Sequence, residues 1–216
     1  NTAIAQEGMH GDYGANIGKV IAIRKDLPSL LKAYAAAGSD ARMNGCELPV
    51  VINSGSGNQG LTVSVPLIIY AEREHLDKEK LYRALVISNL TAIHLKTEIG
   101  RLSAFCGAVS AGAACGAGLA YLKDASEEVM NHTIVNALAI TSGIICDGAK
   151  ASCAAKIAVS VEAGILGYDM YMNGQQFYGG DGIISKGIEN TIHNIGVLGS
   201  QGMASTDQEI IKIMCE

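Results

Sequence analysis

Three of the six cysteines are spaced so that their thiols could surround one metal centre. Cys146 and Cys153 bracket a short segment whose Gly148 should break a helix and turn both thiols toward one point. Cys106 lies earlier, in a stretch rich in small residues. Thiolates select iron–sulfur clusters, zinc or copper(I), and three of them on a cubane cluster leave one iron open as a Lewis acid. The alternative is that all three are small buried hydrophobes, the usual role of a free cysteine.

The other cysteines carry weaker signals. Cys115 follows Cys106 by nine positions, which places it on roughly the opposite side of an ideal helix, so we expect it to pack in the core. Cys46 and Cys215 have no partner pattern. The chain contains no Cys-x-x-Cys pair, which disfavours a structural zinc ribbon.

A glycine-rich segment, residues 53–60, reads Asn-Ser-Gly-Ser-Gly-Asn-Gln-Gly. Its three glycines match a dinucleotide-binding fingerprint, but the chain that follows offers helices instead of the parallel strands that such a fold needs. Free N–H groups at a helix start also form an anion site, which would suit an amino-acid carboxylate. The candidate substrate-binding residues are Asn53, Ser54, Gly55, Ser56, Gly57 and Asn58. A turn without a ligand is the alternative.

Two residues before the small-residue stretch could act as a catalytic base. His94 and Lys96 are both able to accept a proton when neutral, and both lie on one predicted helix. A lone histidine on such a helix is more often structural, so neither assignment follows from spacing alone.

The elements that must position these residues are helices. We expect helices over residues 16–25, 27–37, 61–74, 78–98, 102–122, 127–145, 154–171 and 181–198, and a final short helix capped by residues 205–207. A turn is predicted at residues 38–40 and a short extended run at 49–52. The fold class is therefore mainly α, a single compact multi-helix domain with a glycine-rich substrate loop.

One predicted helix, residues 102–122, carries no charge and is long enough to cross a membrane. It is filled with Gly, Ala, Ser and Cys, which gain little from lipid transfer and instead permit close helix contact. We therefore predict a buried central helix.

The composition excludes several functional classes. The formal net charge is −5, and no basic patch indicates nucleic-acid binding. No polybasic segment indicates a membrane surface, and no secretory segment precedes the cysteines, which favours a cytoplasmic protein with free thiols. The chain begins at Asn1 within a helical pattern, so we expect a fragment or a processed product.

Several motifs together resemble the L-cysteine desulfidase family, which is related to the alpha domain of the iron–sulfur L-serine dehydratases. The matching segments are residues 1–18, 40–43, 48–60, 96–106, 145–153 and 199–214. The resemblance covers essentially the whole chain. It implies a [4Fe-4S] cluster held by Cys106, Cys146 and Cys153, and a substrate that faces the glycine-rich loop.

The resemblance implies β-elimination from L-cysteine to pyruvate, ammonia and hydrogen sulfide. L-Serine dehydration is one alternative, and a non-catalytic helical domain without a cluster is another. Family members are longer, so residues 1–216 would be a cluster-binding alpha domain whose partner is a missing N-terminal part of the same protein. Monomer and homo-oligomer both stay open.

Overall fold

The computed structural model describes all residues, 1–216, and forms one helical body without strands. The helices are α1 (Thr2–His10), α2 (Ile17–Ala22), α3 (Leu27–Met43), α4 (Gly57–Arg73), α5 (Lys78–Ile99), α6 (Gly107–Leu122), α7 (Glu127–Thr141), α8 (Cys153–Met172), α9 (Ile188–Val197), the π-helical turn η1 (Leu198–Gly202) and α10 (Ala204–Cys215). The predicted fold class, a mainly α single domain, is confirmed.

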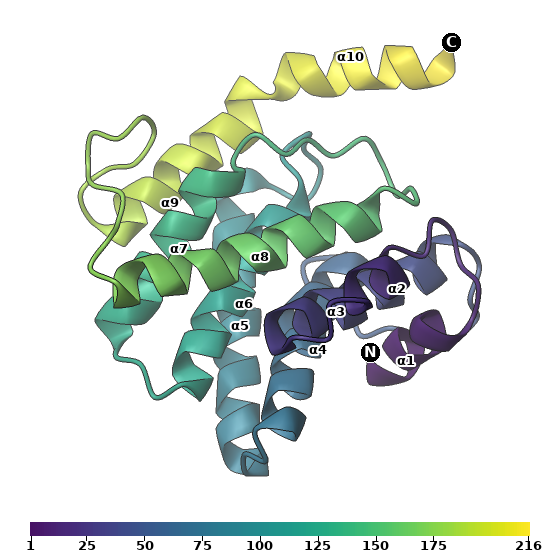
Figure 1. The fold of residues 1–216 in the computed structure, drawn as a ribbon. Helices are drawn as coiled ribbons and strands as arrows, with labels where there is room; N and C mark the ends of the chain where they lie inside the picture. The colour runs from purple at the N-terminus through teal and green to yellow at the C-terminus, as the bar shows by residue number, and fades with distance from the viewer.

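The small-residue helix α6 lies at the centre, in contact with α4, α5, α7 and α8. Figure 1 shows α8 crossing in front of α5 and α6, with α1 to α3 on one side and α7 and α9 on the other. A Cβ at Gly112 of α6 would lie 2.3 Å from the Ser160 carbonyl oxygen of α8, so only glycine permits this approach. No helix combines the length and apolar character needed to cross a membrane. The prediction of a buried central helix is confirmed.

Helix α3 contradicts the turn predicted at residues 38–40. It runs through Gly38, Ser39 and Asp40 to Met43, and all three of these residues are buried. Asp40 accepts a hydrogen bond from the Gly18 N–H at 2.9 Å and so anchors the start of α2. Close packing of neighbouring elements thus outweighs the turn preference of a Gly-Ser-Asp triplet.

Two other predicted helices begin later than expected. The helix expected from residue 102 begins at Gly107, because residues 104–106 pair with 144–146 instead. The helix expected from residue 181 begins at Ile188, because Gly182 and Gly187 adopt φ angles of 63° and 87° that break a helix. By contrast, α5 and α8 match their predicted ranges to within one residue at each end.

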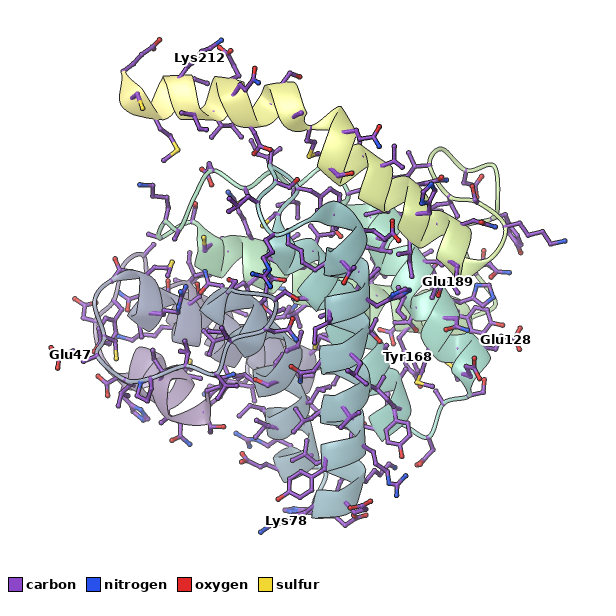
Figure 2. All side chains as sticks on the ribbon, turned by 180° about the vertical axis from the view of Figure 1, so that it is seen from behind. Glu47, Lys78, Glu128, Tyr168, Glu189 and Lys212 are labelled. Carbon is purple, nitrogen blue, oxygen red and sulfur yellow. The ribbon has the colours of Figure 1, made fainter.

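Helices α5 and α10 both have a face that no other helix covers. Figure 2 shows α5 rising through the middle of the back face from Lys78, and α10 extending away from the body toward the C-terminus. No residue of α10 is buried.

Candidate active site

Backbone pairing brings two distant cysteines together. The Cys106 N–H donates to the Ile144 carbonyl at 3.2 Å, and the Cys146 N–H donates to the Ala104 carbonyl at 2.6 Å. Cys106 is the N-cap residue of α6 rather than a residue within the helix. The pairing fixes both thiols at the same end of the central helix.

The third cysteine reaches the same place through a tight loop. Gly148 has a φ of 90°, and the Cys153 sulfur accepts the Lys150 N–H at 3.5 Å while its thiol points to the Gly148 carbonyl at 3.6 Å. Cys153 is also the first residue of α8. Cys106, Cys146 and Cys153 all line one cavity of about 310 Å³.

The surroundings shift the pKa values of Cys106 and Cys146 in opposite directions. The Cys106 thiol donates a hydrogen bond to the Cys146 sulfur, which lowers the pKa of Cys146 to about 6 and raises the pKa of Cys106. Burial also raises the pKa of Cys106, and the nearby Lys156 favours the thiolate of Cys146. Of these two cysteines, Cys146 is therefore the one whose thiolate form the surroundings favour.

The donors do not form a site for a single metal ion. No three His, Cys, Asp or Glu side chains are gathered closely enough to bind one ion. In a tetrahedral zinc site, ligand atoms lie about 4 Å from one another. A cubane cluster instead binds its thiolates at separate corners, so three cysteines spread around one cavity fit it by the chemistry of the donors.

The glycine-rich segment forms a second wall of the cavity. Ser54 and Gly55 have φ angles of 49° and 83°, and Asn53 and Ser56 exchange backbone hydrogen bonds across this turn at 3.1 and 2.9 Å. Ser56 is the N-cap of α4, its side chain accepting the Gln59 N–H at 3.4 Å. The glycine-rich segment is thus a tight turn that runs directly into a helix N-terminus.

The predicted substrate-binding residues divide into two groups. Gly55, Ser56 and Asn58 line the cysteine cavity, whereas Ser54 lines an adjoining hollow. Asn53 is buried and donates to the Asn89 carbonyl and side-chain oxygens at 3.2 and 3.0 Å, so it supports the turn from behind. Gly57 is also buried in the first turn of α4.

The two candidate bases lie in different surroundings. Lys96 is only 5% exposed, lines the cysteine cavity and forms no ion pair, and burial lowers its pKa. The His94 side chain is 50% exposed and pairs with Glu189 at 2.9 Å on the surface. The structure therefore brings Lys96, and not His94, to the cysteines.

Comparison with known proteins identifies the family of this chain. The family described as serine dehydratase alpha chain matches residues 1–212. The chain belongs to that family. No solved structure matches it.

Several relatives of this chain carry the name UPF0597 protein. One from Desulfitobacterium hafniense is 64% identical over 99% of the chain and 50% of the relative. Those from Lachnoclostridium phytofermentans and Finegoldia magna are 54% and 52% identical, over 99% and 100% of this chain and 52% of each relative. The chain therefore spans about half the length of these relatives.

Three of the cationic side chains that line the cysteine cavity were not predicted from the sequence. Arg42, Arg101 and Lys156 line the cysteine cavity with Lys96, and no carboxylate lines it. Arg42 reaches the cavity because α3 continues to Met43, and its guanidinium donates to the Asn58 side-chain oxygen at 3.2 Å. The Asp-Ala-Arg-Met match at residues 40–43 was the signal that could have identified it.

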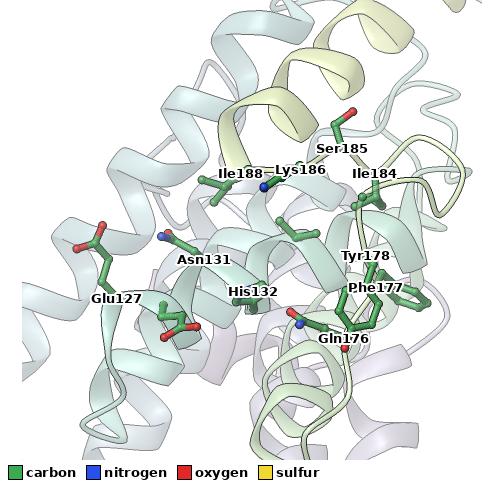
Figure 3. Close-up of a pocket in the computed structure, with 14 residues that line it drawn as sticks. Glu127, Asn131, His132, Gln176, Phe177, Tyr178, Ile184, Ser185, Lys186 and Ile188 are labelled. Carbon is green, nitrogen blue, oxygen red and sulfur yellow. The ribbon is translucent and has the colours of Figure 1, made fainter.

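A larger cavity of about 620 Å³ lies elsewhere, between α7 and residues 176–188. Figure 3 shows Asn131, His132, Phe177 and Tyr178 among its walls. The His132 ring stacks on Tyr171, with ring centres 4.5 Å apart and planes inclined by 7°. No cysteine lines this cavity.

Proposed function

We propose that this chain is the cluster-bearing half of a lyase that removes the β-substituent of a small amino acid, with L-cysteine as the first substrate to test. The observation that carries the proposal is the shared cavity. Cys106, Cys146 and Cys153 line it together with the serine-containing turn and a buried lysine.

Cys106, Cys146 and Cys153 would hold a [4Fe-4S] cluster in this cavity. When bound through three thiolates, such a cluster supplies one open iron as a Lewis acid for the sulfur or oxygen at the substrate Cβ. The lowered pKa of Cys146 favours binding at neutral pH, because the ligand must be a thiolate.

The start of α4 is suited to hold the substrate carboxylate. Its first N–H groups carry the positive end of the helix dipole, and Ser56 and Asn58 line the cavity at this point. The Arg42 guanidinium, bonded to Asn58, adds positive charge. Positioning of this kind can lower a barrier by several kcal/mol, up to about 7–11 in the best-oriented cases.

Lys96 is the candidate for the base that removes the Cα proton. Burial lowers its pKa and so raises the fraction of neutral amine that can accept a proton. The proton moves to Nζ, the C–H electron pair forms the Cα–Cβ double bond, and the Cβ–S bond breaks with its electron pair on sulfur. The released aminoacrylate tautomerises to an imine, and water hydrolyses the imine to pyruvate and ammonia.

The choice between cysteine and serine depends on the leaving group. Hydroxide is a poor leaving group and needs more assistance from an acid than hydrosulfide does. Sulfide is a better leaving group at neutral pH, which favours L-cysteine. L-Serine is the alternative that the family description favours.

Anaerobic reconstitution with iron and sulfide tests the proposal. We expect about four iron atoms per chain and a visible charge-transfer absorption. Loaded protein of the relatives' full length should then release sulfide and pyruvate in equal amounts from L-cysteine. Pyruvate from L-serine alone would select the dehydratase. Failure to take up iron, in both the 216-residue chain and the full-length protein, would instead support a non-catalytic helical domain.

A further inference from the structure

Helix α5 exposes a stripe of large apolar side chains. Tyr82, Val86, Leu90 and Ile93 are 56%, 56%, 60% and 45% exposed. At 100° per residue they fall within an arc of roughly 80° on the helix. Figure 2 shows the helix that carries them on the back of the molecule, with no other helix over it.

The α5 stripe, these four residues, differs from scattered surface hydrophobics. Single exposed apolar residues are normal, whereas a contiguous apolar patch marks an interaction surface. Between Arg83 and His94 the helix carries no charged residue at all. If this face of the helix were exposed only to solvent, charged side chains would be expected among the apolar ones.

The stripe extends to the mouth of the candidate active site. Ile93 and the 60% exposed Ile52 line a hollow that also contains Lys96 and Arg101. Lys96 and Arg101 line the cysteine cavity as well. Whatever covers the stripe therefore also covers this side of the cavity.

We propose that the α5 stripe is the docking surface for the remaining half of a protein of the relatives' length. The relatives are about twice as long as this chain, so each of them contains a further segment about as long as this chain in the same polypeptide. The Asn1 side-chain oxygen accepts the Val51 N–H at 2.8 Å, so any chain joined to Asn1 would start next to Val51. Val51 is 72% exposed and adjoins Ile52. Chain attached at Asn1 would thus emerge beside the apolar surface.

This docking would complete the site. A cover over Ile52 and Ile93 encloses the hollow beside Lys96 and excludes water from the reacting groups. The inference concerns which surface is covered and does not depend on the reaction proposed above.

Hydroxyl-radical footprinting of a full-length polypeptide that contains this chain tests the inference without requiring turnover. Normalised for intrinsic reactivity, Tyr82 and Leu90 should be oxidised at least about tenfold less than two control residues on other surfaces. The controls are Ile23 and Val159, which are 74% and 53% exposed in this chain. Similar oxidation of the stripe and the controls would overturn the proposal.

Two further results separate the alternatives. Protection that disappears on dilution to a monomer, measured by light scattering, would assign the stripe to a second copy and overturn the proposal. In the full-length protein, Leu90→Asp should restore oxidation of Tyr82 at least about fivefold, whereas the matched Val159→Asp should not. If Leu90→Asp leaves Tyr82 protected, the stripe is not the docking surface.

Discussion

The cavity beside α7 and the cysteine cavity differ in volume and, in the opposite sense, in the reactive side chains that line them. The larger, of about 620 Å³, contains no cysteine, and its neighbouring polar groups are partly satisfied within the protein. Tyr171, for example, donates to Glu128 at 2.8 Å while it stacks on His132. The smaller, of about 310 Å³, gathers three thiols and a buried lysine without an ion pair. The cysteine cavity is therefore distinguished by the side chains that line it and not by its volume.

The origin of the difference is structural. The smaller cavity lies at the N-terminal ends of α4, α6 and α8, where Ser56, Cys106 and Ser152 are the N-cap residues. Helix N-termini carry positive potential and free N–H groups, which favour thiolates and carboxylates. The larger cavity also adjoins helix N-termini, those of α7 and α9, but the first turn of α7 places Glu127 and Glu128 in its lining, and it contains no thiol.

Removing a thiol from the smaller cavity should have the largest effect. Cys146→Ser should abolish cluster uptake, with iron falling at least about tenfold in anaerobic reconstitution, because a hydroxyl is a poor ligand for iron–sulfur clusters. Cys115→Ser is the matched control, since Cys115 is fully buried in α6 away from the cavity. It should retain iron and lose about 1–3 kcal/mol of stability if its hydroxyl lacks a partner. Equal iron loss in both variants would refute the ligand assignment.

Lys96→Met should remove turnover and preserve the fold. Loss of a general base lowers kcat by about 10²- to 10⁴-fold, whereas Lys78→Met, an exposed change on the same helix, should have no effect. Burial lowers the folded-state pKa of Lys96, so the unfolded chain binds the proton more tightly. The free energy of unfolding of the wild-type protein should therefore increase as the pH rises from the lowered folded-state pKa of Lys96 to the ordinary pKa of lysine. This rise should be smaller in Lys96→Met, as measured by urea unfolding across pH. A variant with wild-type kcat would exclude Lys96 as the base.

Bulk at Gly57 should impair catalysis without removing iron. A Cβ at this position would lie 2.4 Å from the Arg42 Nε and 2.6 Å from a methyl group of Val50. Gly57→Val should therefore displace Arg42 and lower kcat/KM by about 10²-fold, the cost of a misplacement of about 1 Å. Gly143→Ala is the control, because nothing lies within 4 Å of its added Cβ. Unchanged kcat/KM in Gly57→Val would show that Arg42 and the turn do not position the substrate.

The sequence predicted the helices that have strong local signals. Asp77 caps α5 by accepting the Lys80 N–H at 2.9 Å, and that helix was placed within one residue. The turn predicted at residues 38–40 was wrong. The helix continues there because Gly38 packs close to Leu61, a long-range contact that no local pattern reveals. Helix ends formed by long-range pairing, such as that before Gly107, were misplaced for the same reason.

The candidate site was only partly visible in the sequence. The cysteines and the glycine-rich turn could be selected by residue type and resemblance. That Cys106 and Cys146 meet depends on hydrogen bonds between residues about 40 positions apart, which spacing does not encode. Arg42 was not predicted as a site residue, because it lies in the last turn of a helix that was expected to end at residue 37.

The smallest effect is expected in the larger cavity. His132→Ala removes the ring stacked on Tyr171 and should cost about 0.5–1.5 kcal/mol beyond the lost burial, measured as a shift in the urea midpoint. Tyr171→Phe is the matched variant, because it retains the stack and loses only the hydrogen bond to Glu128. Neither change should alter iron content or kcat/KM, since no cysteine and no residue of the 53–60 segment lines that cavity. A tenfold fall in kcat/KM with normal iron would instead make the larger cavity part of the substrate site, and would reverse the comparison between the two.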